Sequence, residues 1–178
     1  NLPYVQQLKV SDKRHVSMYT KTENCFEAHR IIRQNPDKLF TLVTHNSDMP
    51  IRECTMPDNL YRWFAQNREW DHPKVLSIPL GLENEYWFSY KQDIMLNTPT
   101  QETRLIRSFA QFNCDTHRER SHIYSKLRSK IVDIHQGTNG NMERHILFCN
   151  NLKKYAFCVC PRGNGVDTHR LWEALYME

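Results

Sequence analysis

The feature that most constrains the fold is an uninterrupted run of strand-forming residues at 39–44, Leu-Phe-Thr-Leu-Val-Thr. The run contains no charged residue, which is typical of a strand in a parallel sheet that is covered on both faces. A helix-like segment precedes it over 24–34 and ends before Pro36, which cannot continue a helix. Because parallel strands cannot be joined by a tight turn, this order predicts strands that alternate with helices or long loops.

The same alternation extends along the chain and predicts an α/β fold with two lobes. The loop-forming sequence Asn97–Thr100 is expected to mark the junction, so that the lobes comprise residues 1–97 and 98–178. The strands expected in the first lobe, all parallel, are 14–20, 39–44, 60–65 and 75–78. The elements expected in the second lobe are strands at 104–112 and 155–160, helices at 116–130 (capped by Asp115 or Thr116), 142–152 and 167–177, and a linker at 137–141.

The charge of the chain favours a small anionic partner. The formal net charge of +4 suits a nucleotide diphosphate, but it is too small and too scattered to indicate nucleic acid. The most basic segment, 116–130, is interrupted by Glu119 and has no aromatic stacking surface, so its cationic side chains are expected to form a solvated face. No apolar run approaches the roughly 18 residues that a membrane span needs.

The six cysteines lack the regular spacing of a disulfide framework. Cys158 and Cys160 alternate on an expected strand, and the others are spread over the chain. We therefore expect reduced thiols and a cytoplasmic location.

A glycine-rich loop, Pro161–Gly165, separates the strand expected at 155–160 from the last helix. A tight loop that opens a helix presents backbone N–H groups and the positive end of the helix dipole, and the two together favour an anion. Gly163 and Gly165 allow another group to approach the backbone closely and permit unusual dihedral angles. The loop is therefore a candidate anion-binding site.

Three side chains near this loop are candidates for contact with a nucleotide. Arg162 and Arg170 can bind phosphate oxygens in fork geometry, and Glu173 can accept hydrogen bonds from both hydroxyls of a ribose. Two alternatives stay open: an ordinary turn with a surface arginine, and a surface ion pair between Arg170 and Glu173. A dinucleotide-binding fingerprint is disfavoured, because its third glycine falls on Thr168 and no further strand follows. The residues of the last helix expected to pack against the sheet are Leu171, Ala174 and Leu175.

Polar residues also follow the apolar run at 39–44, where α/β proteins place their ligands. His45 or Asp48 can act as a base toward an acceptor hydroxyl. The alternative is an Asx-type turn in which Asn46 and Asp48 bond the local backbone. Residues 66–67 and 81–83 follow later strands in the same way, and are expected either to line the same crevice or to form turns.

Residues 160–163 read Cys-Pro-Arg-Gly, and residues 170–175 read Arg-Leu-Trp-Glu-Ala-Leu. Together they resemble the nucleotide-sugar motif of exostosin-like glycosyltransferases, in which a similar loop leads into an Arg-x-x-Glu-Ala-Leu helix. The version with Gly-Asn-Gly and Asp-Thr-His-Arg is similar to microbial and large-virus members, above all to enzymes encoded by viruses of algae. Segments 44–48, 63–67 and 73–84 resemble the N-terminal half of the same group, and 109–120 does so more loosely.

The resemblance implies a GT-B fold, with two Rossmann-like lobes built on parallel sheets and with the donor bound by the C-terminal lobe. It implies transfer of a sugar from a UDP-sugar, UDP-xylose among them, to a hydroxyl of a glycan or glycoprotein, with inversion at the anomeric carbon. His45 or Asp48 would be the base on the acceptor side. The residues expected to bind the donor are Arg162, Gly163, Asn164, Gly165, Asp167, His169, Arg170 and Glu173.

Family members continue beyond the last helix with a strand and further helices. The donor lobe is therefore expected to be incomplete at Glu178. A viral enzyme of this kind would act in the host cytoplasm.

The sequence contains no recognisable metal-binding motif. None of the nine histidines forms a His-x-x-x-His pair, since His117 and His122 are five apart, and no Asp-x-Asp motif occurs. We therefore expect a reaction that needs no metal and no other cofactor, with arginines and helix-terminal amides stabilising the departing diphosphate. The alternative from a different class is a catalytically silent nucleotide- or carbohydrate-binding module.

Overall fold

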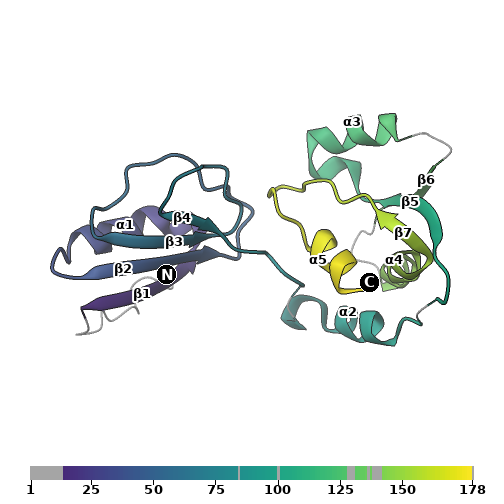
Figure 1. Ribbon diagram of the computed structural model, residues 1–178, viewed down its shortest axis with the longest axis horizontal. Helices are drawn as coiled ribbons and strands as arrows, with labels where there is room; N and C mark the ends of the chain where they lie inside the picture. Colours follow the sequence, from purple (N-terminus) through teal and green to yellow (C-terminus); the bar gives the residue numbers. More distant parts are fainter. Residues whose placement is uncertain are drawn as a thin grey trace. The chain divides into compact units, whose positions relative to one another are not determined.

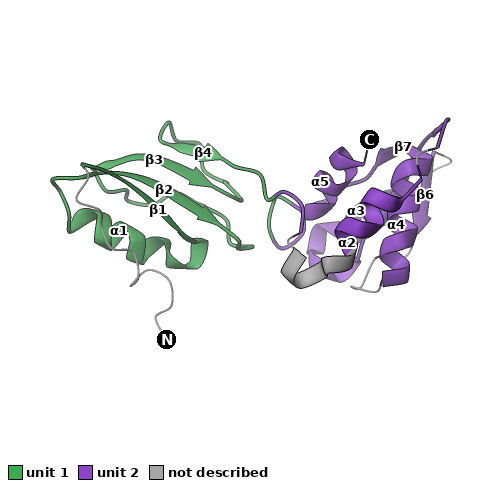
Figure 2. Cartoon of the chain, turned by 90° about the horizontal axis from the view of Figure 1, so that it is seen from below, with its two compact units in different colours: residues 1–80, 165–167 green, residues 81–164, 168–178 purple. Residues whose placement is uncertain are grey.

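The computed structural model describes residues 14–83, 85–99 (85–90 by their backbone alone), 101–127, 131–135, 137 and 142–177. The chain is an α/β protein with two parallel sheets, as the alternation of strands and helices predicts. It divides into two compact units, drawn in green and purple in Figure 2. Unit 1 is Asn1–Leu80 with Gly165–Asp167, and unit 2 is Gly81–Asn164 with Thr168–Glu178.

Unit 1 contains a four-stranded parallel sheet in the order β1-β2-β3-β4 (Figure 1). The strands are β1 (His15–Lys21), β2 (Leu39–His45), β3 (Leu60–Ala65) and β4 (Val75–Ser77). A short 3-10 turn, Thr22–Asn24, leads from β1 into α1 (Cys25–Arg33), which packs on one face of the sheet (Figure 2). Each expected strand of the first lobe is therefore confirmed to within one residue.

The core of unit 1 lies between α1 and the sheet. Ala28 and Ile32 of α1 are fully buried, and they belong to one apolar cluster with Phe40, Leu42 and Trp63 of the sheet. The other face of β2 is less covered than its sequence predicts, because Thr41 and Val43 are only half-buried. In the described part of unit 1, α1 is the one α-helix available to cover the sheet.

Unit 2 contains a three-stranded parallel sheet in the order β6-β5-β7. Its strands are β5 (Leu105–Gln111), β6 (Val132–His135) and β7 (Tyr155–Cys158). Its helices are α2 (Glu85–Asn97), α3 (Arg118–Lys126), α4 (Met142–Lys154) and α5 (His169–Tyr176). Phe109 of β5, Phe148 and Leu152 of α4, Tyr155 of β7 and Met177 form its buried cluster.

Two elements of unit 2 are absent from the sequence-based prediction. Strand β6 is only four residues long, all half-buried, and carries Asp133 in its middle, so it has no apolar signal. Asp133 accepts hydrogen bonds from Arg107 and from the hydroxyl of Tyr155 (2.8 Å), which satisfies its charge beside the sheet. Helix α2 packs against α4 and belongs to unit 2, so the division after Leu80 differs from the expected junction after Asn97.

The helix expected at 116–130 begins later than predicted. Asp115 and Thr116 belong to a 3-10 turn, Cys114–Thr116, and the cap of α3 is His117, whose Nδ1 accepts from the backbone N–H of Glu119 (3.3 Å). Residues 128–130 of that expected helix, and all of the expected linker except Gly137, lie outside the described residues.

Unit 1 buries a histidine in its core. His29 of α1 is 2% exposed, and its ring meets that of Trp63 edge-on at 5.0 Å. Its Nε2 has no hydrogen-bond partner among the described residues. Burial, helped by the nearby Arg33, lowers the pKa of His29 to about 4. Since the unfolded chain takes up the proton first, the stabilisation is fully present above pH 6.5 and is lost as the pH falls toward 4.

We expect acid to destabilise unit 1 through this one side chain. The shift corresponds to about 3 kcal/mol in the free energy of unfolding between pH 7 and pH 4. Urea denaturation at a series of pH values measures it, and His29→Leu should flatten the pH dependence by about that amount. The matched control is His15→Gln, at an exposed histidine of β1. An unchanged pH dependence in His29→Leu would show that His29 is not the titrating group.

Candidate functional site

The loop after β7 lies at the carboxyl end of the unit 2 sheet, where α/β proteins bind ligands. Its part in unit 2 is Pro161–Asn164, and Thr168, also in unit 2, leads directly into α5, whereas Gly165–Asp167 belong to unit 1. Pro161 and Gly163 are buried, whereas Asn164 is exposed. The expected order of strand, glycine loop and helix is therefore present, although α5 begins at His169, two residues later than predicted.

A buried arginine of α3 fixes the start of this loop. Arg120 is 7% exposed, and its guanidinium donates to three backbone carbonyls: Arg162 (2.6 Å), Asn113 (3.1 Å) and Pro161 (3.4 Å). Burial lowers the pKa of Arg120, and the nearby Arg170 lowers it further. The expectation of a fully solvated basic face on this helix is therefore wrong for Arg120. The sequence around Arg120 does not distinguish it from the exposed Arg118. The role of Arg120 could therefore not be predicted from the sequence.

The two glycines of the loop are required for close approach. A Cβ on Gly163 would lie 3.3 Å from Nη2 of Arg120, and one on Gly165 would lie 2.6 Å from Nδ2 of Asn67, within unit 1. Neither glycine has a positive φ; among the described glycines only Gly81 does, at 77°. Both glycines therefore admit close approach of protein side chains, whereas neither has the positive φ of the unusual dihedral angles expected.

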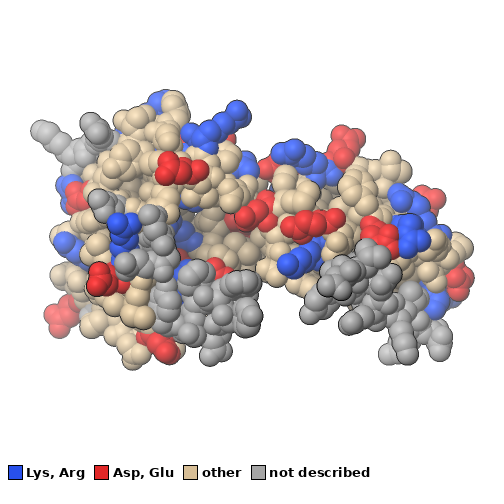
Figure 3. Space-filling view, turned by 180° about the vertical axis from the view of Figure 1, so that it is seen from behind, with Lys and Arg blue, Asp and Glu red and all other residues tan. Residues whose placement is uncertain are grey.

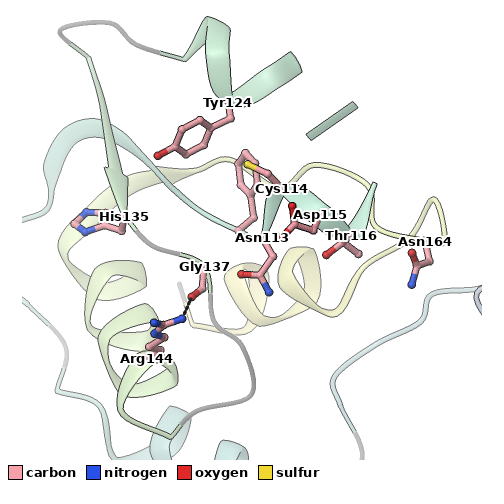
Figure 4. A pocket seen from close by; sticks show the side chains of 10 residues that line it. Asn113, Cys114, Asp115, Thr116, Tyr124, His135, Gly137, Arg144 and Asn164 are labelled. Atoms are coloured by element: carbon pink, nitrogen blue, oxygen red, sulfur yellow. Dashed lines mark hydrogen bonds between the residues drawn. The ribbon is translucent and has the colours of Figure 1, made fainter. Parts of the chain in front are cut away.

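A cavity of about 750 Å³ opens beside this loop in unit 2 (Figure 4). It lies where β5 and β6 end, and its wall combines aromatic rings with polar side chains. Arg144 of α4 donates to the carbonyl of Gly137 (3.2 Å) at one side of the cavity, drawn as a dashed line in Figure 4. The residues that line the cavity are Phe112, Asn113, Cys114, Asp115, Thr116, Tyr124, His135, Gly137, Arg144 and Asn164.

Arg170, expected to bind phosphate, is turned into unit 2. Its guanidinium lies 4.8 Å from the centre of the Phe148 ring, and Nη1 donates to the carbonyl of Gln111. Its Nε is shielded from solvent and has no hydrogen-bond partner among the described residues. Burial lowers the pKa of Arg170, against the opposing effect of Cys158, Glu173 and Cys160. The guanidinium is therefore engaged with Phe148 and Gln111.

Glu173 is buried rather than on the surface. It is 5% exposed, and its carboxylate lies 3.6 Å from Nζ of Lys91 on α2. The alternative of a surface ion pair with Arg170 is therefore wrong. The expected packing face of α5 is also wrong in part, since Leu171 and Leu175 are 39% and 50% exposed, whereas Ala174 and Met177 pack into the core.

Two further candidates on the donor side bind other parts of the chain. His169 donates from Nδ1 to the carbonyl of Gly81 (2.7 Å), and its Nε2 lies 3.4 Å from the carboxylate of Glu83. In unit 1, Asp167 accepts at Oδ2 from the backbone N–H of Leu80 (2.6 Å), and its own N–H donates to Oδ1 of Asn67 (2.9 Å). These contacts fix the backbone around both positions.

The two candidate bases lie in unit 1, directly after β2. His45 donates from Nε2 to the carbonyl of Pro79 (3.1 Å), so Nδ1 is its accepting nitrogen. Asp48 is exposed. Among the candidate residues, unit 1 therefore contains His45, Asp48, Gly165 and Asp167, whereas unit 2 contains Arg162, Gly163, Asn164, His169, Arg170 and Glu173.

Buried amides fix the loop that contains Asp48. Gln66 accepts from the N–H of Asn46 (2.8 Å), and both Gln66 and Asn67 donate to the carbonyl of Ser47 (3.0 and 2.8 Å). Asn46 adopts a left-handed conformation, with φ 56°. Ser47 closes the turn by accepting from the N–H of Met49 (3.0 Å). Residues 66–67 form a turn themselves, one of the two expectations, and their side chains also fix the turn after β2.

The described residues show mixed surface charge on the face drawn in Figure 3 and no group of metal ligands. Figure 3 shows Lys and Arg side chains interspersed with Asp and Glu on the face that it draws. Within the described part of the chain, no three His, Cys, Asp or Glu side chains are grouped as a metal would require. No helix among the described residues has the length and apolar character to cross a membrane.

Comparison with known proteins leaves the site without a named relative. No protein-family model matches the sequence, and no curated protein matches it. The resemblance to exostosin-like glycosyltransferases therefore rests on the motif residues alone.

We expect Arg120→Ala to destabilise unit 2, because it leaves backbone carbonyls of two segments without their donor. The cost should be about 2–4 kcal/mol in the free energy of unfolding, measured by urea denaturation. The control is Arg118→Ala, on the same helix but exposed, which should cost less than about 0.5 kcal/mol. Equal effects of the two substitutions would contradict the role assigned to Arg120.

Proposed function

We propose that the chain is an exostosin-like glycosyltransferase of GT-B type. It would transfer a sugar from a nucleotide diphosphate, with UDP-sugars (UDP-xylose among them) as the first candidates, to a hydroxyl of a glycan or glycoprotein. The observation that carries the proposal is the Cys-Pro-Arg-Gly loop between β7 and α5, fixed by buried Arg120 and beside a cavity of about 750 Å³. An ordinary surface turn would need neither a buried arginine nor an adjacent cavity.

The donor diphosphate would bind at the loop. Its oxygens would accept from backbone N–H groups at the start of α5, where the helix dipole is positive. Arg162 would add a charge-assisted bond, and Gly163 has no side chain to obstruct the approach. Arg170, half-buried against Phe148, would add to the positive potential. Together these groups would stabilise the diphosphate as it leaves, without a metal ion.

Glu173 remains the proposed acceptor of the ribose hydroxyls. Its carboxylate is 5% exposed and lies 3.6 Å from Nζ of Lys91, so a ribose would have to displace neighbouring groups of unit 2 to reach it. On the acceptor side, His45 is a better candidate base than Asp48, because its hydrogen bond to Pro79 leaves Nδ1 to take up a proton. With inversion, the acceptor oxygen would lose its proton to a base and attack the anomeric carbon opposite the departing diphosphate.

One observation favours the second candidate, a silent nucleotide- or carbohydrate-binding module. Arg170, His169 and Asp167 all use hydrogen-bonding atoms on other parts of the chain. Arg162 and the backbone amides would then be the groups left to contact the diphosphate. Such a site suits binding of a nucleotide more readily than it suits stabilisation of a departing diphosphate. Binding of UDP without release of UDP from a UDP-sugar, in the presence of a glycan acceptor, would favour the module.

We expect Arg162→Ala to weaken binding of UDP by about 1.5–3 kcal/mol, roughly 10- to 100-fold in Kd, because a charge-assisted bond is lost. Arg162→Lys should recover only part of the affinity, since the planar fork is lost. Isothermal titration calorimetry measures both, with Arg118→Ala as the control. Unchanged affinity in Arg162→Ala would remove the loop from the donor site.

A further inference from the structure

Two cysteines lie side by side at the end of β7. Cys158 is the last residue of the strand, and Cys160 follows two positions later, immediately before Pro161. Their Sγ atoms are 3.7 Å apart, although both residues are free thiols. The other cysteines include Cys149, which is fully buried in the core of unit 2.

The pair can be reached from solvent. Both cysteines are half-buried and line a second cavity of unit 2, of about 270 Å³. Its wall includes Phe157, Leu171 and Leu175, which are 59%, 39% and 50% exposed. A small reagent that enters this cavity therefore meets both sulfurs.

The backbone permits a bond between the two sulfurs. Alternate residues of an extended strand have Cα atoms about 6.6 Å apart, close to the upper end of the range seen in disulfides. Cys158 is fixed in the ladder opposite Phe109, and the N–H of Val159 donates to the carbonyl of Phe109 (2.9 Å). Cys160 lies beyond this last ladder bond, so its movement toward Cys158 breaks no bond of the ladder, although it must shift Pro161, whose carbonyl accepts from Arg120.

We propose that Cys158 and Cys160 form a reversible disulfide, by exchange with a small-molecule disulfide such as oxidised glutathione. The Cys160 thiolate attacks one sulfur of oxidised glutathione, forms a mixed disulfide and releases one glutathione thiolate. Cys158 then loses its proton and attacks Sγ of Cys160, which expels the second glutathione thiolate. Two protein thiols are oxidised to one disulfide, and one glutathione disulfide is reduced to two thiols, so electrons balance.

The two cysteines have different roles in this sequence. The pKa of the Cys160 thiol lies below its ordinary value, because the Cys158 thiol can donate to the Cys160 thiolate and the Arg170 guanidinium is near. The pKa of Cys158 is raised, by its interaction with Cys160 and by burial. Cys160 is therefore the attacking thiol and Cys158 the resolving one.

The disulfide would alter the loop that follows. Drawing Cys160 toward Cys158 displaces Pro161, whose carbonyl accepts from Arg120. The modification is thus coupled to the start of the glycine loop through its backbone. The proposal does not depend on what the loop binds, because the disulfide is detected directly.

The test exposes the full chain to oxidised glutathione, blocks the remaining thiols by alkylation and maps the peptides by mass spectrometry. Wild type should lose two hydrogens in the peptide that contains both cysteines, and a reducing agent should restore them. Cys158→Ser should instead retain one glutathione on Cys160. Cys160→Ser should form no disulfide in this peptide, because the partner thiol of Cys158 is absent.

Cys149→Ser is the matched control, a buried cysteine of the same unit, and should form the Cys158–Cys160 disulfide like wild type. Far-UV circular dichroism verifies that each variant is folded, and the wild-type result stands without any variant. Two outcomes would overturn the proposal: a wild-type peptide that remains reduced, or one that carries glutathione on each cysteine without closing to a disulfide.

Discussion

The structure of the candidate site depends on the burial of one guanidinium. A buried charge is costly unless its hydrogen-bonding groups are satisfied, and Arg120 satisfies them with three backbone carbonyls from two separate segments. Two constraints follow. The segments after β5 and β7 must lie within reach of the Arg120 guanidinium. The arginine in turn must remain in place to satisfy the carbonyls of both segments. Gly163 is part of the same constraint, because a side chain there would meet the guanidinium.

Unit 1 uses neutral amides for the same purpose. Gln66 and Asn67 follow β3, are buried, and bind the turn after β2 through its carbonyl and N–H groups. Asn67 also accepts from the N–H of Asp167, so a single buried amide serves two loops of unit 1. In both units, therefore, buried polar side chains fix the loops at the carboxyl ends of strands, where α/β proteins bind ligands. Such fixed loops can present backbone groups to a ligand without first being ordered, which lowers the entropic cost of binding.

Much of the fold follows from local sequence patterns, whereas much of the site does not. The strands β1 to β3 have apolar side chains at the positions that face α1, and the glycine loop with its helix is visible as a motif. Strand β6 was not predicted because Asp133 interrupts it, and its charge is satisfied by Arg107, distant in sequence. The burial of Arg120 and Glu173 could not be predicted for a similar reason, because it depends on partners that only the tertiary structure brings near. Leu171 and Leu175 follow helical spacing, yet the buried side of α5 is the one that carries Glu173 and Met177.

The loop between β7 and α5 is proposed to bind a nucleotide diphosphate through its backbone amides. Hydrogen–deuterium exchange with and without UDP measures those amides directly, and uridine, which lacks phosphate, is the matched control. We expect slower exchange at Arg162–Asn164 and in the first turn of α5 when UDP is present, with little change when uridine is present. Exchange that is unchanged in this segment under saturating UDP, or equally slowed by uridine, would contradict it.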